Sequence, residues 1–390
     1  MMRPEESLLI KLCRLTFSEK TIAEIGDIIE KITDWSCFFS LANNHGVVAL
    51  TIYNLDRLKY IGKMPEENVI IFKKQLLQNM RDNVYKTSVL AKAHITLNES
   101  DIKTVLLKGM ALELTVYGNK GLRQMSDVDV LMTKEDCLMA RDILLKEDFV
   151  SDPVKSSFHK KIITEYGKHL PTLRMDEFAL ELHHVLLSDK DNGFTKQVYE
   201  TATSHLVNGI EKAYIPSPQL LFVYLVHHLS NHEHNNESQL RLYTDLVVML
   251  EHYEDKILNH SLMEISDSLG LSKEMATKLI ILQKYWDIRY SDAIEGFIKK
   301  NVDSRCDETF LFFLGSPKNK KRSDAATYRN KIANIPGFSN KLLYVLGDIF
   351  PSLSFMKKRY KCGALKAILH YPYRLGKLFY LIGNYHEKEK

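Results

Sequence analysis

The octapeptide Met125-Ser-Asp-Val-Asp-Val-Leu-Met132 indicates an extended strand, because apolar residues flank and separate its two carboxylates. A strand turns alternate side chains to the same side. Asp127 and Asp129 therefore project together, and Val128 and Val130 face the opposite way. Two adjacent carboxylates repel each other unless a positive charge lies between them, and a divalent cation is the usual solution. The octapeptide thus predicts a strand that carries a metal site.

The residues before this strand predict another strand, a tight turn and a helix. Val105-Leu-Leu-Lys-Gly109 is an apolar run that ends in Lys-Gly, and Met110 to Tyr117 suits a short helix. Glycine permits close backbone approach to a phosphate, and a helix N-terminus favours an anion. Gly109 is therefore the candidate phosphate turn. Lys108 and Arg123 are nearby cations that can hold phosphate oxygens.

A later strand supplies a third acidic side chain. In Ala179-Leu-Glu-Leu-His-His184, Glu181 and His183 lie two residues apart and therefore share one face of the strand. A carboxylate among apolar residues on a strand is costly without a partner. Glu181 is thus the natural third acid beside the first two.

These features match the requirements of metal-assisted nucleotide transfer. That chemistry needs carboxylates for one or two divalent ions, a turn that admits a triphosphate, and a base or third carboxylate. Each feature also has an ordinary explanation. Asp-x-Asp is common in surface loops. In the ordinary explanation Lys108 is a surface charge at the end of a strand, and Glu181 is half of a structural ion pair. Their order along the chain favours a nucleotidyltransferase fold.

Helical periodicity flanks the central region on both sides, so the predicted fold class is α+β. A small mixed-sheet core lies between N-terminal and C-terminal helical regions. We expect four parts: a helical N-terminal region at 1–100, the catalytic core at 101–210, a helical domain packing on the core at 211–315, and a basic, aromatic-rich helical segment at 316–390.

Several local signals place the elements more closely. Asp34 and Thr133 are predicted N-caps, the latter of a helix to about Asp148, and one long helix is predicted at 66–98. Further expectations are antiparallel strands at 160–166, 169–174 and 178–186 with a turn at 175–177, helices at 219–230 and 239–250 with a loop near Asn231, a polar linker at 315–324, and helix breaks at Pro351, Gly363, Pro372, Gly376 and Gly383.

The composition describes a globular chain of two or three domains. The chain has 390 residues, of which 45% are hydrophobic and 26% charged. No apolar run approaches the roughly 18 residues that cross a bilayer, and the N-terminus does not resemble a signal peptide. The five cysteines are scattered without a C-x-x-C pair, which favours a reduced, cytoplasmic protein without a cysteine zinc site.

The charge is distributed unevenly. Residues 316–390 contain sixteen Lys/Arg against four Asp/Glu, whereas the whole chain has a net charge of only +4. Aromatic residues are interleaved with these lysines. Such a segment can bind RNA or an anionic membrane surface. Alternatively, its lysines form an ordinary solvated surface and its aromatic residues lie in the core.

Four segments carry a resemblance to a known family: 106–112, Tyr117, 123–131 and 180–183. They resemble the uncharacterised bacterial nucleotidyltransferase family of the DNA polymerase beta superfamily. Its typical order is Lys-Gly, a Tyr, an Arg, Ser-Asp-x-Asp-Leu, then an acid and a His on a later strand. The resemblance is most specific across 104–186 and weaker in the helical flanks.

The resemblance implies a mixed sheet that holds Mg²⁺, or Mn²⁺, on Asp127 and Asp129, with Glu181 as the third acid. The usual turn of the superfamily is Gly-Ser or Gly-Gly. Here Met110 follows Gly109, so no hydroxyl is supplied to the phosphates at that position.

Two groups outside the core are further candidates for lining the site. On a helix His228 and His232 are four residues apart and can bind zinc together, line a polar site, or simply end the helix. Arg241 and Asp245 are also four apart, either as an ordinary helix ion pair or with Arg241 reaching the nucleotide.

Lys168 and His169, just before Pro171, are expected to approach the site from the strand beside Glu181. His183, which shares a strand face with Glu181, is expected to line the site too.

We therefore expect transfer of a nucleoside monophosphate from an NTP such as ATP to an acceptor hydroxyl. Lys108, Gly109 and Arg123 would position the triphosphate. The competing interpretation is a catalytically silent module that keeps the fold and binds nucleotide, RNA or a partner protein, which the missing hydroxyl at Met110 supports. A zinc hydrolase built on His228 and His232 is a third interpretation. The acceptor is not specified by the sequence.

Overall fold

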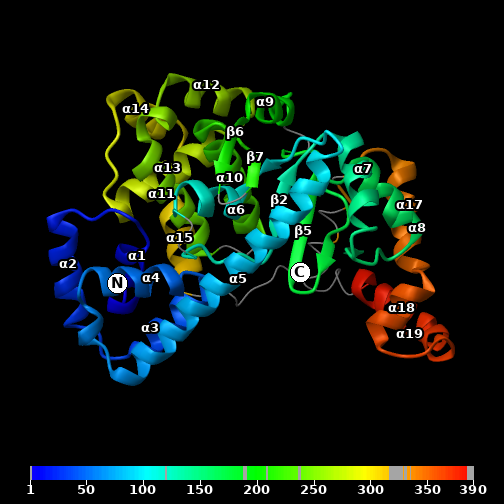
Figure 1. Ribbon diagram of the computed structural model, residues 1–390, viewed down its shortest axis with the longest axis horizontal. Helices are drawn as coiled ribbons and strands as arrows, with labels where there is room; N and C mark the ends of the chain where they lie inside the picture. The colour runs from blue at the N-terminus through cyan, green and yellow to red at the C-terminus, as the bar shows by residue number, and fades with distance from the viewer. Residues whose placement is uncertain are drawn as a thin grey trace.

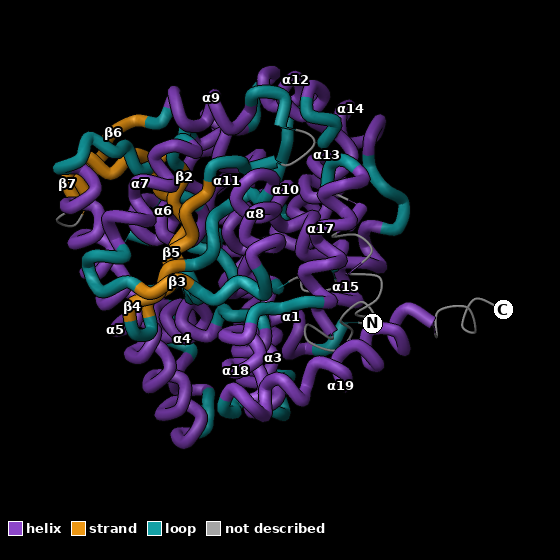
Figure 2. The backbone as a smooth tube through the Cα atoms, turned by 90° about the vertical axis from the view of Figure 1, so that its right-hand side faces the viewer, coloured by secondary structure: helices purple, strands orange, loops and turns teal. Residues whose placement is uncertain are grey.

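The computed structural model describes residues 2–118, 121–187, 191–207, 210–235, 239–315, 328, 332–333 and 335–383. It confirms the α+β class, since helices surround one mixed sheet of seven strands among these residues. In Figure 1 the first helices lie at lower left and the last at the right. Figure 2 shows the strands as one band on one side of a largely helical molecule.

The sheet places the predicted Asp-x-Asp strand at its centre. Its strands are β1 (Val105–Leu106), β2 (Val128–Leu131), β3 (Val150–Ser151), β4 (Leu173–Met175), β5 (Phe178–His183), β6 (Thr203–Val207) and β7 (Ile210–Ile215), in the order β3-β4-β5-β2-β1-β7-β6. β2 pairs antiparallel with β1 and parallel with β5, while β7 pairs parallel with β1. Val128 and Val130 are buried, as are the residues of β1. Covered by apolar neighbours, β2 thus holds its side chains in a rigid frame.

The N-terminal region is helical as predicted. Its helices are α1 (Pro4–Leu12), α2 (Glu19–Ile29), α3 (Trp35–Asn44), α4 (Val48–Arg57), the short η1 (Ile61–Lys63) and α5 (Glu66–Asn98). Asp34 caps α3 by accepting a hydrogen bond from the N–H of Cys37 at 2.8 Å, which confirms the predicted N-cap. α5 confirms the long helix and runs from this region to the sheet (Figure 1).

The second helical region follows β7. Its helices are α10 (Pro218–His234), α11 (Leu240–Ile257), α12 (His260–Ser268), α13 (Ser272–Trp286), α14 (Asp292–Asn301) and α15 (Cys306–Gly315). The predicted helices at 219–230 and 239–250 are both present, but the expected loop at Asn231 is wrong because α10 continues to His234. Asn231 stays helical, and its side-chain amide hydrogen-bonds His227 one turn earlier at 2.8 Å.

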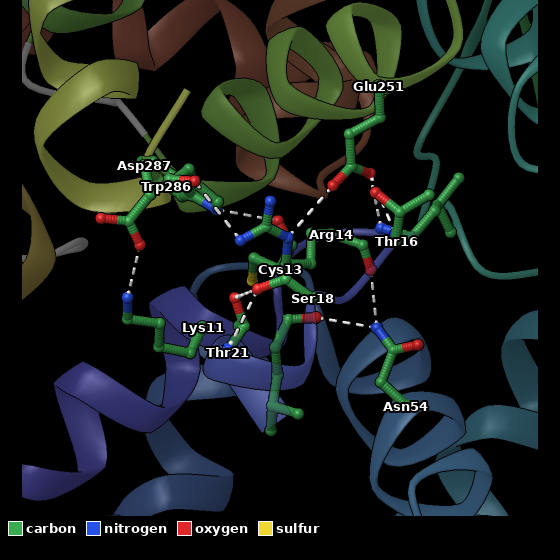
Figure 3. A network of polar contacts seen from close by, with 12 residues as sticks. Lys11, Cys13, Arg14, Thr16, Ser18, Thr21, Asn54, Glu251, Trp286 and Asp287 are labelled. Atoms are coloured by element: carbon green, nitrogen blue, oxygen red, sulfur yellow. Dashed lines mark hydrogen bonds and ion pairs between the residues drawn. The ribbon is translucent and has the colours of Figure 1, made fainter. Parts of the chain in front are cut away.

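The loop after α1 joins the two helical regions (Figure 3). Arg14 donates to Glu251 of α11 at 3.1 Å, and Glu251 also accepts from two backbone N–H groups of the same loop. Trp286 of α13 donates its indole N–H to the carbonyl of Cys13 at 3.0 Å. Asn54 of α4 donates to two further carbonyls there. These contacts satisfy buried backbone groups at the junction.

Short helices complete the central region: α6 (Lys108–Thr115), α7 (Lys134–Leu144), α8 (Ser157–Tyr166) and α9 (Phe194–Thr201). Thr133 caps α7 as predicted, accepting from the N–H of Asp136 at 3.1 Å, although the helix ends at Leu144 rather than about Asp148. β4 and β5 form the predicted hairpin, with Asp176 in the left-handed conformation at its turn.

The expectation of a strand at 160–166 is wrong, because this segment belongs to α8. Ser156 caps the helix by accepting from the N–H of His159 at 3.2 Å. The β-branched run Ile162-Ile163-Thr164 favours a strand locally. However, the buried residues His159 and Ile162 are three apart, which is helical spacing. Burial of that face decides the conformation.

The described part of the C-terminal segment is α17 (Phe338–Ile349), α18 (Leu353–Tyr360) and α19 (Ala364–Gly383). The predicted linker lies outside the described residues, except Gly315, which ends α15. Helix breaks at Pro351 and Gly363 are confirmed. Breaks at Pro372 and Gly376 are wrong, because α19 continues through both. Contacts made by α19 on either side of Pro372 hold it in place, which offsets the hydrogen bond that proline removes. None of the described helices is both long and apolar enough to traverse a bilayer.

Asp348 anchors this segment on the core. α17 packs on α8, whose His159 lies 3.6 Å from the buried carboxylate, and Lys155, just before α8, lies 2.7 Å from it. A Cβ at Gly347 would approach His159 Nδ1 to 2.5 Å, so only glycine permits this approach. Burial alone would raise the pKa of Asp348, but the nearby His159 and Lys155 lower it to about 2.

We expect Asp348→Asn to loosen α17, with a loss of about 2 kcal/mol at neutral pH. A carboxyl pKa that is lower in the folded state stabilises above its unfolded value of about 4, and that stabilisation is lost as the pH falls to about 2. Hydrogen exchange of the α17 amides at pH 7 and pH 3 measures this. The difference in exchange rate between parent and variant should be smaller at pH 3 than at pH 7. An equal difference at both pH values would contradict a stabilising role of the Asp348 charge.

Candidate active site

The junction of β1 and α6 brings Lys108 beside β2. Leu107 donates its N–H to the carbonyl of Asp129 at 3.0 Å, and Lys108 then adopts a φ of +46°. The sequence predicts the turn at Gly109, but the left-handed residue is one position earlier. Gly109 is required for a different reason, since a Cβ there would lie 2.9 Å from Met125 Cγ.

Asp129 is the buried centre of the site. Its Oδ1 lies 2.6 Å from Lys108 Nζ and 2.8 Å from His183 Nε2. Burial by itself would raise the pKa of Asp129, but Lys108 and His183 lower it well below its ordinary value. Burial would likewise lower the pKa of Lys108, yet the Asp129 carboxylate raises it. The site therefore contains an ionised carboxylate beside a charged ammonium.

Glu181 and His183 extend the cluster along β5. The parallel register places Glu181 beside Asp129. Glu181 Oε2 lies 3.3 Å from His183 Nε2 and 3.8 Å from His169 Nε2. Burial would raise the pKa of Glu181, but the two histidines lower it. One ligand atom each from Asp129, Glu181 and His183 lie within 4.8 Å of one another, a spacing that suits a metal ion.

Asp127 immediately precedes β2 and is half-buried. Its Oδ1 accepts a hydrogen bond from Ser126 Oγ at 2.9 Å. It is not a member of the three-ligand group of Asp129, Glu181 and His183. However, Asp127 and Asp129 line the same cavity, as the alternation of side chains along the strand predicts.

This cavity brings together many of the sequence-predicted residues. Its volume is about 110 Å³, which is smaller than a whole nucleotide needs. Its walls carry carboxylates on β2 and cations on α6 and α11. The lining residues are Lys108, Gly109, Arg123, Met125, Ser126, Asp127, Asp129, His228, His232, Gln239, Arg241 and Leu242. Glu181 and His183 are not among these lining residues, but both lie beside Asp129, which is.

Arg123 lines the cavity and forms an ion pair with α11. Its Nε and Nη2 donate to the two carboxylate oxygens of Asp245 on α11, at 2.8 and 2.6 Å. Tyr117 donates to the same carboxylate at 3.1 Å. Burial would lower the pKa of Arg123, but Asp245 raises it. The ion pair of Asp245 is thus with Arg123, and the i,i+4 pair with Arg241 does not form in the described structure.

Arg241 is left as a cation of the cavity wall. Its Nη1 donates to the carbonyl of Gln124 at 2.8 Å, while its Nε is buried without a hydrogen-bond partner among the described residues. Burial and the nearby Arg123 lower the pKa of Arg241 to about 10. An anion in the cavity would relieve both costs, because it would supply an acceptor and a countercharge.

The histidines of α10 meet the site at two places. His228 and His232 line the cavity with ring centroids 4.5 Å apart. Burial and Lys108 lower the pKa of His228 well below its ordinary value, so it is neutral. His227 lies beside Lys168, with Nε2 and Nζ 3.5 Å apart. In the described chain neither His228 nor His232 belongs to a group of three metal ligands.

Sequence reasoning missed the residues that hold the loop before β2. Glu113 of α6 accepts hydrogen bonds from the N–H groups of Gly121 and Arg123, at 2.5 and 3.0 Å. Asn79 and Asn83 of α5 donate to the carbonyls of the same two residues. The signal was present, since Glu113 is the one acid of α6 and is flanked by two leucines. Such an acid requires buried partners.

We expect Gly109→Ala to destabilise the protein by about 1–3 kcal/mol, because the new methyl group overlaps Met125 in the cavity wall. Gly296→Ala in α14 is the matched control, since a Cβ there meets nothing within 4 Å. Alanine is the better helix former, so the control should gain up to about 1 kcal/mol. Urea unfolding of both variants measures the difference, and equal effects would refute the close packing at Gly109.

A comparison with known families finds a match. The family described as uncharacterised nucleotidyltransferase matches residues 31–287. This range contains all the strands of the described sheet, together with α5, α10, α11 and α13. It therefore includes every residue of the cavity. No curated protein matches the chain.

Proposed function

The chain belongs to the uncharacterised nucleotidyltransferase family, and we propose that it transfers a nucleoside monophosphate from an NTP to an acceptor hydroxyl, with pyrophosphate as the leaving group. The observation that carries this proposal is the cavity itself. Asp127 and Asp129 form one wall of the cavity, and Lys108 and Arg241 are cations on the others. A triphosphate with bound cations needs both kinds of charge within one cavity.

The donor set fits a divalent ion. Asp129 and Glu181 offer oxygens, the ligands that Mg²⁺ prefers, and His183 adds a nitrogen that suits Mn²⁺ better. Asp127 adds a further carboxylate on the cavity side. When bound, such an ion would align the attacking and leaving oxygens and neutralise their developing charge.

The side chains of the protein have separate tasks in this proposal. His183 and His169 keep Glu181 ionised, so that its carboxylate either helps to bind the ion or accepts the hydroxyl proton. Lys108 exchanges its contact with Asp129 for a phosphate oxygen. Arg241 uses its Nε, which has no hydrogen-bond partner in the described part of the chain, for the same purpose. Because the cavity is small, it receives the phosphate end, and the base and sugar extend beyond it.

One observation favours a second candidate, a module that binds nucleotide without catalysis. Lys108 Nζ occupies Oδ1 of Asp129 at 2.6 Å, so an internal cation already balances this carboxylate. Met110 also brings no hydroxyl to the turn. A protein of this kind would bind NTP through Lys108 and Arg241 without transferring any part of it.

Label transfer distinguishes the two candidates. The protein is incubated with each α-labelled NTP, Mg²⁺ or Mn²⁺, and separate pools of small hydroxyl compounds, proteins and RNA. We expect label in one pool, and none with Asp127→Asn. A parent protein that shows an NTP-dependent rise in melting temperature but transfers no label under any condition would support the silent module. The absence of both signals would contradict both candidates.

A further inference from the structure

The last described helix turns an apolar face to solvent. In α19, Leu365, Ile368, Leu369 and Tyr373 are 83, 53, 76 and 64% exposed. Their spacing of three, four and eight residues places them on one side of the helix. A surface helix normally buries such a stripe against the core. In α19 the apolar side thus faces solvent, where a polar side is usual.

The opposite face of α19 fixes this orientation. Ala367 is fully buried. Tyr371 donates its hydroxyl to the carbonyl of Pro351 at 2.5 Å, and Arg374 Nε donates to the carbonyl of Asp348 at 3.3 Å. Because Asp348 is itself anchored on α8, the helix cannot rotate its apolar face inward without breaking these contacts.

The segment that carries the apolar face is basic. No acidic residue occurs between 349 and 376. α18 and α19 lie at the right-hand edge of the molecule in Figure 1, which is the side that faces the viewer in Figure 2. The exposed basic residues of α18, the following turn and the start of α19 are Lys357, Lys358, Arg359, Lys361 and Lys366. We call these five residues and the four exposed apolar residues of α19 the basic–apolar surface.

We propose that the basic–apolar surface docks on an anionic lipid bilayer. The apolar face of α19 would enter the boundary between headgroups and acyl chains, and the lysines would contact the lipid headgroups. Stacking on single-stranded nucleic acid uses aromatic side chains, and only Tyr373 of the four exposed apolar residues is aromatic. A second copy of the chain would bring like charges together. The proposal concerns where the protein resides, and it is independent of the proposed transfer.

Vesicle co-sedimentation of the full chain tests the proposal. We expect binding to vesicles of phosphatidylcholine mixed with phosphatidylglycerol, at least tenfold weaker binding to phosphatidylcholine alone, and weakening with added salt. Lys357→Gln combined with Lys358→Gln should lower the affinity about thirtyfold. Lys299→Gln combined with Lys300→Gln, at two adjacent exposed lysines of α14, is the matched charge control and should bind like the parent.

The apolar contribution has its own matched pair. Leu369→Glu should reduce vesicle binding at least tenfold, whereas Leu206→Glu, 79% exposed on β6, should not. All these positions are exposed, and unchanged melting curves verify that each variant is folded. Equal binding to both vesicle types would overturn the proposal. So would a dimer that Leu369→Glu dissociates, or binding of an RNA oligonucleotide but no vesicle.

Discussion

Replacing Asp129 by asparagine should lower the proposed transfer by about a thousandfold. The substitution keeps the shape of the side chain but removes the charge at the centre of the cluster, and such charges contribute several kcal/mol to a metal-assisted transition state. It should also destabilise the protein, because Lys108 would stay largely buried without its countercharge. Label incorporation and urea unfolding measure the two effects separately.

Asp127→Asn is the matched variant, because Asp127 lines the same cavity but is only half-buried. We expect a comparable loss of transfer with a change of less than about 1 kcal/mol in the free energy of unfolding. If Asp129→Asn retained full transfer while Asp127→Asn lost it, Asp129 would be a structural partner of Lys108 rather than a catalytic residue. Normal transfer by both variants would reject the site.

Asp245→Asn should cost about 3–5 kcal/mol of folding stability. Arg123 would remain buried without its countercharge, and Tyr117 would lose the acceptor of its hydroxyl. Arg123 also precedes β2 by a few residues, and its backbone N–H is held by Glu113. We therefore expect hydrogen exchange to increase in the loop before β2 as well as in α11. Urea unfolding gives the energy, and hydrogen exchange gives the location.

Asp152→Asn provides the control for this loss. Asp152 pairs with Arg174 at 3.0 Å, but both side chains of this pair are exposed to solvent. Exposed pairs contribute at most about 1 kcal/mol. A similar cost for Asp152→Asn and Asp245→Asn would mean that burial does not set the strength of the Arg123–Asp245 pair.

Much of the fold could be predicted because its signals are local. The alternation at β2, the N-caps at Asp34 and Thr133, and the long helix α5 depend on residues close together in sequence. α8 shows the limit of such signals. Its β-branched run favours a strand, and only packing against α17, where His159 contacts the ring of Tyr344, makes it helical.

The candidate site was predicted in the same partial way. The pattern named the acids, and the structure brings Asp129, Glu181 and His183 within reach of one ion. The sequence pattern could not reveal that Lys108 adopts the left-handed backbone conformation, since a lysine rarely does so. Nor could it reveal that Gly109 is needed for another reason, the close approach of Met125, which excludes a side chain at that position.

By itself the sequence determined the α+β class, the central strand and the residues that carry charge. Only the tertiary structure decided which charges meet. Asp245 lies four residues from Arg241 on one helix, yet it pairs with Arg123, 122 residues away. The reason is desolvation. A buried carboxylate loses its contacts with water and must pair with donors that the fold brings to it, and spacing along the sequence does not specify which donors these are. The same rule pairs Asp129 with Lys108 and leaves Arg241 facing the cavity.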